Sequence, residues 1–213
     1  MSERGTFLTF EGGEGSGKST QLRALARRLE VAGLPVLVLR EPGGTPIGEA
    51  VRSLLLDPDH TGIDATAELL LYEASRAQLV ADIIEPALAA GRVVICDRFY
   101  DSTTAYQGYA RGLSLAHIGE LNATATGGLA PDRTVVLDID PELGIERATR
   151  QGADRLEGES LAFHRAVRDG FLAIAAAEPT RVRVVDASGS PDEVAERVIA
   201  AVSDLPQLAG TLA

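Results

Sequence analysis

Residues 12–19 carry a pattern suited to chemistry on a nucleotide. Their sequence, GGEGSGKS, has the spacing GxxxxGK[ST] of a phosphate-binding loop and stands between an apolar run and a run of helical periodicity. The glycines let successive backbone amides turn inward around an anion, and the start of the following helix adds the positive end of its dipole. Lys18 can reach the outer phosphates, and Ser19 can hold Mg²⁺. A turn that merely begins a helix would not need the Lys18-Ser19 pair, so the pattern predicts a magnesium-dependent ATP site.

Two aspartates are candidates for a second contact to the metal, because each directly follows an apolar run that reads as a strand. They are Asp97 and Asp138, and the spacing alone leaves both open. We favour Asp97, since Arg98 follows it and places a phosphate-binding cation beside a carboxylate at a strand end. For Asp138 a strand-ending or helix-capping role before Pro141 is the better interpretation. The predicted metal ligands are therefore Ser19 and Asp97.

Three arginines surround a break between two predicted helices. Arg147, Arg150 and Arg155 flank the sequence QGAD at 151–154, and we expect a mobile lid over about 147–158. An arginine brought in by a closing lid neutralises the transferring phosphoryl group and excludes water from it. For any single arginine of the three, a solvated helix surface is an equal alternative.

The acceptor is expected to be a phosphate monoester. The three histidines, His60, His117 and His164, lie in segments without a nucleophile or metal-ligand pattern, so no general base is evident. A phosphate monoester is already anionic near neutral pH, and positioning with charge neutralisation can replace proton abstraction. A nucleoside monophosphate fits this requirement.

The elements that position these residues alternate between strands and helices. Strands are predicted at 6–10, 36–39, 93–96, 134–137 and 182–185. Helices are predicted from the end of the phosphate loop and at 47–56, 65–90 with a kink near Pro86, 114–126, 142–149, 159–178 and 192–202. β-Branched runs flanked by helices predict a three-layer α/β fold, with a five-stranded parallel sheet covered on both faces and ligands at the carboxyl ends of its strands. We expect a single domain over 1–213 with a loosely ordered tail at 205–213.

Composition narrows the class of partner. The chain has 213 residues, 45% of them hydrophobic, and a formal charge of −11, which disfavours a nucleic-acid or anionic-membrane binder. It contains no run of about 18 apolar residues that would cross a bilayer. The single cysteine, Cys96, cannot form an internal disulfide. These features predict a cytoplasmic protein that binds small molecules.

Four segments together resemble the bacterial type of thymidylate kinase, a family of P-loop nucleoside monophosphate kinases, along nearly the whole chain. They are FEGGEGSGKST at 10–20, REPGGT at 40–45, DRFYDSTTAYQG at 97–108 and DRLE at 154–157. A phosphate loop alone also occurs in motors, GTPases and transporters, so the combination is far more specific. The resemblance implies the reaction ATP + dTMP → ADP + dTDP with Mg²⁺, and a homodimer.

The resemblance also implies roles for single residues. Tyr72 stacks on the thymine ring, and Arg76 donates to a base carbonyl. Glu14 lies near the sugar 3′-hydroxyl, Tyr106 lies where a ribose 2′-hydroxyl would project, and the alanine at 187 belongs to a loop beside adenine. The substrate-binding residues it implies are Glu14, Arg40, Pro42, Tyr72, Arg76, Arg98, Thr103, Tyr106 and Gln107. The nucleotide-binding residues are Gly12, Gly13, Glu14, Gly15, Ser16, Gly17, Lys18, Ser19, Thr20 and Ala187, and the catalytic residues are Lys18, Arg98, Arg150 and Arg155.

Two positions depart from parts of the family. Gly15 follows Glu14 where the eukaryotic branch has an arginine, so transition-state charge must be met from the lid. Thr103 stands where some relatives have an asparagine that faces the base. The alternatives to dTMP phosphorylation are a P-loop kinase of another nucleoside monophosphate or of a nucleoside, and a non-catalytic ATP-binding switch.

Overall fold

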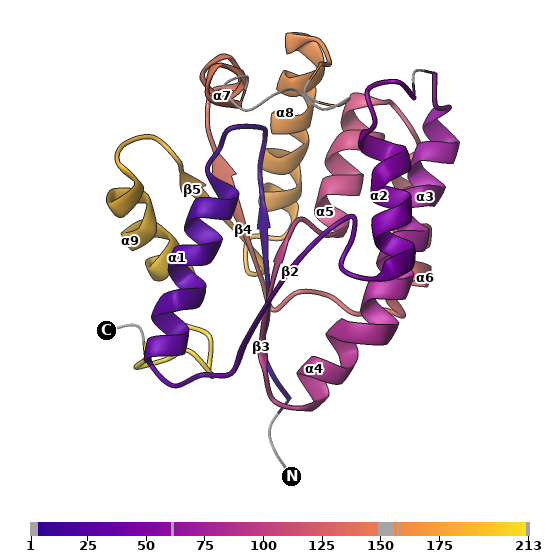
Figure 1. Cartoon of the computed structure of the whole chain (residues 1–213). Helices are drawn as coiled ribbons and strands as arrows, with labels where there is room; N and C mark the ends of the chain where they lie inside the picture. The colour runs from indigo at the N-terminus through magenta and orange to yellow at the C-terminus, as the bar shows by residue number, and fades with distance from the viewer. Residues whose placement is uncertain (1–3, 61, 149–155, 157, 212–213) are drawn as a thin grey trace.

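The computed structural model describes residues 4–60, 62–148, 156 and 158–211. A five-stranded parallel sheet in the order β2-β3-β1-β4-β5 runs through the centre, with helices on both faces (Figure 1). The strands are β1 (Phe7–Glu11), β2 (Val36–Arg40), β3 (Val93–Asp97), β4 (Arg133–Asp138) and β5 (Val182–Asp186). The predicted fold class and all five predicted strands are confirmed. None of the helices in the described ranges is long and apolar enough to span a membrane.

Helices α1 (Lys18–Val31) and α9 (Pro191–Val202) cover one face of the sheet. Their apolar sides meet the sheet in a core that includes Leu29, Val198 and Phe10. The other face carries the remaining long helices, with α8 packed on the η2 segment and α3 beside α2 and α6. These elements are α2 (Pro46–Leu56), α3 (Ala65–Leu79), η1 (Val80–Ile84), α4 (Glu85–Ala89), α5 (Tyr100–Thr103), η2 (Thr104–Ala110), α6 (Leu115–Thr126) and α8 (Leu161–Ala177), while α7 (Pro141–Ala148) follows β4. Because β1 is covered from both sides, all five of its residues are buried.

The predicted long helix over 65–90 is interrupted where expected. It runs as α3, widens into the π-helical segment η1 and continues as α4, which has Pro86 in its first turn. Proline has no amide hydrogen, so the bond that an α-helix would make at this position is lost and the ladder widens just before it. A second π-helical segment, η2, follows α5 and carries Tyr106 and Gln107. The sequence patterns assigned no element to that segment.

The tail differs from the prediction of loose order. Leu205 and Leu208 are buried in the core cluster that α1 and α9 form with the sheet. The side-chain amide of Gln207 also donates to the carbonyl oxygen of Gly91 at 3.0 Å. The alanines and glycines of the tail favoured a prediction of loose order. The tail also contains two leucines spaced three residues apart, and a single turn places them on one side. Residues 205–211 are therefore packed against the domain.

We predict that Leu208→Ala lowers the free energy of unfolding by about 2–4 kcal/mol, because it removes a fully buried side chain and leaves a cavity. The matched control is Leu115→Ala, whose side chain is 45% exposed and whose loss should cost less than about 1 kcal/mol. Urea unfolding followed by circular dichroism measures both. Equal stability of the Leu208 variant and wild type would show that the tail does not contribute to the core.

Candidate active site

A cleft of about 780 Å³ opens at the carboxyl ends of β1, β2 and β3. It is large enough for nucleotide-sized ligands, and strand ends are the usual place for ligands in parallel α/β sheets. Of the predicted site residues, those that line it are Glu14, Gly15, Gly17, Lys18, Ser19, Thr20, Arg40, Pro42, Tyr72, Arg76, Asp97, Arg98, Thr103, Tyr106 and Gln107. The predicted catalytic residues Arg150 and Arg155 lie outside the described residues, whereas Arg147 lines the cleft.

The phosphate loop has the backbone that its glycines allow. Gly12, Gly15 and Gly17 have φ angles of 136°, 63° and 89°, values that residues with side chains rarely adopt. A β-carbon on Gly12 would also lie 2.5 Å from the carbonyl oxygen of Leu137 in β4. Gly17 caps α1 without a side-chain bond, so the first amides of α1 remain directed toward the cleft. The loop therefore presents a concave group of donors suited to phosphate.

Lys18 lies inside this loop. Its Nζ donates to the carbonyl oxygens of Gly12 and Gly13 at 3.1 and 2.8 Å, and the residue is 8% exposed. Burial, followed by the nearby charge of Arg98, lowers the pKa of the Lys18 amine. Ser16 also bonds to the Gly13 carbonyl, at 2.8 Å. The ammonium group is thus held at the place where phosphates bound to the loop would lie.

The two predicted metal ligands touch each other. Parallel pairing of β1 with β3 places Asp97 at the same sheet edge as the loop, and Ser19 Oγ donates to Asp97 Oδ2 at 2.8 Å. Hard oxygen ligands from a hydroxyl and a carboxylate fit Mg²⁺, which usually takes only one or two protein ligands beside phosphate and water. The alternative, Asp138, is held by two bonds from Arg168 at 2.6 and 2.8 Å.

Arg98, Glu14 and Tyr106 form one cluster between the loop and η2. Arg98 donates to Glu14 Oε1 at 2.6 Å and to the Gly12 carbonyl at 3.1 Å, and its guanidinium lies 5.1 Å from the centre of the Tyr106 ring. The Tyr106 hydroxyl donates to the same Glu14 oxygen at 2.8 Å. Burial alone would raise the pKa of Glu14, but Arg98 and then Lys18 outweigh it and lower the pKa to about 2. Glu14 is consequently a fixed carboxylate.

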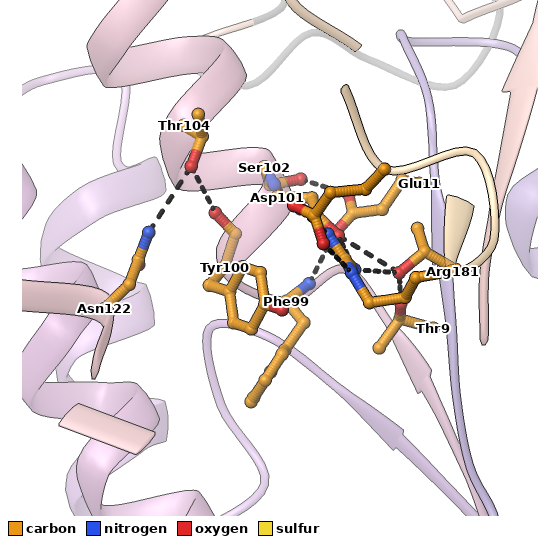
Figure 2. A network of polar contacts seen from close by, with 11 residues as sticks. Thr9, Glu11, Phe99, Tyr100, Asp101, Ser102, Thr104, Asn122 and Arg181 are labelled. Carbon is orange, nitrogen blue, oxygen red and sulfur yellow. Dashed lines mark hydrogen bonds and ion pairs between the residues drawn. The ribbon is translucent and has the colours of Figure 1, made fainter. Parts of the chain in front are cut away.

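Glu11 was not among the predicted site residues, yet it holds the segment that carries Arg98 (Figure 2). The carboxyl oxygens of Glu11 accept from the amides of Phe99 and Ser102 at 2.7 and 3.3 Å and from the Ser102 hydroxyl at 2.5 Å. Arg98 itself has a φ of 70°, the only such non-glycine residue in the described chain. Burial, and next the charge of Asp101, raise the pKa of Glu11 to about 8. The signal available in the sequence was an acidic residue that ends an apolar strand.

A second group of contacts holds the same segment, next to Glu11 (Figure 2). Arg181, just before β5, makes two bonds to the carboxylate of Asp101 at 2.7 and 2.9 Å. Thr134 donates to that carboxylate at 3.0 Å and shares a hydrogen bond with Thr9 at 2.7 Å. This network joins β1, β4 and the start of β5 to α5. In the sequence, the indication of this network was a threonine in each of two apolar strands.

Arg76 is buried in a charged cluster and is not a solvated helix residue. Its guanidinium donates to Glu41 and Glu73 at 2.9 Å each, to Thr103 at 2.9 Å and to Asn122 at 3.2 Å. These contacts use four of its five N–H groups and leave one on Nη2 at the cleft wall. Burial raises the pKa of Glu41 to about 7, although Arg76 opposes the shift. Neither acidic partner was predicted.

The other predicted residues fall into two groups. Beside Arg76, Tyr72 is half-buried one helical turn earlier in α3, and Gln107 donates to Glu68 at 2.9 Å. At the outer end, Arg40 is paired with Glu49 at 3.0 Å. Ala187 is not among the residues that line the cleft. It is 3% exposed in the core after β5, and its amide donates to the Asp138 carbonyl.

A phosphate loop that faces a second cationic subsite across one sheet edge defines the class of P-loop phosphotransferases. Comparison with known proteins gives the family, since the family model described as thymidylate kinase matches residues 10–198. The chain belongs to the thymidylate kinase family. The thymidylate kinase of Deinococcus radiodurans is 54% identical over 202 residues, covering 94% of this chain and 98% of that protein. That of Solidesulfovibrio magneticus is 53% identical over 207 residues, covering 93% and 99%. The crystal structure of thymidylate kinase from Ehrlichia chaffeensis superposes with a TM-score of 0.76 at 38% identity, covering 92% of this chain and 97% of that one.

We predict that Glu11→Gln removes part of the pH dependence of stability. The Glu11 pKa is raised from 4.5 to about 8 in the folded chain, so between these values the unfolded chain has lost the proton and the folded chain keeps it. Wild type should therefore lose stability relative to the variant as pH rises from 5 to 8, by up to about 4 kcal/mol. Urea unfolding of both proteins at the two pH values tests this. A constant difference between them would contradict the raised pKa.

Proposed function

We propose that this chain transfers the γ-phosphoryl group of ATP to dTMP, giving ADP and dTDP for dTTP supply. The observation that carries the proposal is the arrangement of the cleft. Lys18, Tyr72, Arg76 and Arg98 all line this one cleft, and Arg98 donates to Gly12 and Glu14 of the phosphate loop. Membership of the thymidylate kinase family supports the same reaction.

On the donor side, the chain's own groups bind and orient the triphosphate. Amides of the loop and the start of α1 hold the phosphate oxygens, and Lys18 moves from the Gly12 and Gly13 carbonyls to the outer phosphates. Mg²⁺ would be held by Ser19 and Asp97, where it would neutralise charge on the β- and γ-phosphates. Ala187 would lie near the adenine.

On the acceptor side, positioning replaces a general base. Arg98 and Arg40 would hold the dTMP phosphate so that one of its oxygens, already anionic, approaches the γ-phosphorus in line. The Glu14 oxygen Oε1 is occupied by Arg98 and Tyr106, which leaves Oε2 to accept from the sugar 3′-hydroxyl. Tyr106, fixed by these contacts, would exclude a ribose 2′-hydroxyl.

The base end suits a carbonyl and disfavours an amino group. The remaining N–H of Arg76 is a donor, and a guanidinium cannot accept a hydrogen bond from an exocyclic amine. Its four existing bonds fix its direction, so recognition requires little ordering on binding. Tyr72 would supply the stacking face, and Thr103, Gln107 and Pro42 would complete the wall.

The remaining features of the proposal lie outside the cleft. Arg150 and Arg155 would close over the transferring group from a lid at about 147–158. We also propose a homodimer, supported by the exposed apolar side chains of Leu54 on α2 and Leu70 on α3, which are about half exposed. A cytoplasmic location would place the enzyme with its nucleotide substrates.

The decisive experiment is steady-state phosphorylation of dTMP, dUMP, UMP, dCMP and dGMP with Mg·ATP. We expect the highest kcat/KM for dTMP, because a base carbonyl faces Arg76 and the sugar lacks a 2′-hydroxyl. Lys18→Ala is the control and should reduce kcat at least about 100-fold while the protein stays folded. A higher kcat/KM for UMP or dGMP would overturn the acceptor assignment, and a near-normal rate in the lysine variant would overturn the role of the loop.

A second prediction concerns the stacking face. Tyr72→Ala should raise KM for dTMP about tenfold or more, since stacking on an aromatic ring is worth about 1–3 kcal/mol per base. Tyr72→Phe keeps the ring and should remain within about twofold of wild type. Initial rates over a range of dTMP concentrations measure both variants. An unchanged KM in the alanine variant would show that the base lies elsewhere.

A further inference from the structure

The tip of the phosphate loop meets helix α7 backbone against backbone. A β-carbon on Gly144, in the first turns of α7, would overlap the carbonyl oxygen of Glu14. A β-carbon on Gly15 would in turn overlap the carbonyl oxygen of Gly144. Gly144 is buried. Any side chain at either glycine must therefore push the loop and the helix apart.

Packing beside this backbone contact is incomplete. Beside the contact lies a cavity of about 20 Å³, lined on the loop side by Gly13 and on the α7 side by Pro141 and Ile145. A cavity of this size holds about one water molecule, and interiors that are fully packed have no such gap. The backbone contact between the glycines is therefore flanked by unfilled space on this side, while α7 packs on α8 elsewhere.

The same face of α7 carries an arginine. Arg147 is three residues beyond Gly144, which places the two on one side of the helix, and Arg147 lines the cleft. A shift of α7 away from the loop would move this guanidinium away from phosphates bound there. Charge neutralisation by a preorganised cation depends steeply on such placement.

We propose that Gly144 is a positioning residue, which seats α7 on Glu14 and Gly15 and thereby places Arg147 over the phosphates held by the loop. The inference rests on the proposed phosphoryl transfer. Gly144 would thus affect how Arg147 is placed during phosphoryl transfer and would not itself bind the nucleotide.

A double-mutant cycle on the full-length chain tests this role, with Gly144→Ala, Arg147→Ala and the double variant assayed at saturating Mg·ATP. Each single change should lower kcat by about 10- to 100-fold with a smaller change in KM for dTMP. The double variant should be no slower than Arg147→Ala alone, because the glycine acts through the arginine. Gly119→Ala on α6 is the matched control, since its β-carbon would meet nothing within 4 Å and wild-type kcat is expected.

Multiplication of the two losses in the double variant would overturn the proposal, as would a wild-type kcat in Gly144→Ala or Arg147→Ala. Should Gly144→Ala not fold, Gly15→Ala replaces it in the cycle, because its β-carbon would overlap the Gly144 carbonyl oxygen; Mg·ATP affinity is then measured beside kcat, since Gly15 also belongs to the phosphate loop. Should wild type prefer another monophosphate, the cycle is run with that acceptor. The acceptor assignment and the role of Gly144 thus fail separately.

Discussion

The carboxyl group of Glu11 joins the phosphate loop to the segment that carries Arg98. It ends β1 immediately before the phosphate loop and accepts hydrogen bonds from the amides of Phe99 and Ser102 at the end of β3. Because β1 and β3 are adjacent parallel strands, a single side chain can bridge the two loops. The bridge keeps Arg98 in a left-handed conformation that few side chains adopt, with its guanidinium on Glu14. Burying this carboxyl without a full counter-charge raises its pKa, which is the cost of the connection.

The cluster around Arg76 is also built from buried charged groups, but with a different charge balance. Arg76 lies between Glu41 and Glu73, all three nearly excluded from water. The cluster sets two carboxyl groups against one guanidinium, so removing Arg76 would leave both acidic side chains buried without a counter-charge. Under the proposed function, the four hydrogen bonds of the Arg76 guanidinium would fix the direction of its remaining donor, so that little entropy is lost when the base binds. The donor end is held by backbone instead, since phosphate is recognised by amides.

The features that could be predicted are those determined by residues close together in the sequence. The phosphate loop, the five strands and the proximity of Ser19 to Asp97 all follow from local spacing and from the rule that parallel strands end at one edge. The features that could not be predicted depend on pairs far apart in the chain. Arg181 reaches Asp101 across 80 positions and Arg76 reaches Glu41 across 35, and periodicity carries no information on either. The burial of Leu208 was not predicted because its neighbours are small and polar, although its three-residue spacing from Leu205 indicates that the two leucines share one side of a turn.

The presence of a single lysine limits which side chains of this protein can react with amine-directed reagents. Lys18 is the only lysine among the 213 residues, and the other 19 basic side chains are arginines. Guanidinium groups are not acylated under conditions that modify amines, so an amine-directed reagent finds one side-chain target, inside the phosphate loop. Bound nucleotide would shield that target. Labelling of the Lys18 amine, measured separately from that of the α-amine of the chain, thus becomes a count of unliganded sites, and enzymes that acetylate lysine side chains have none to act on outside this loop.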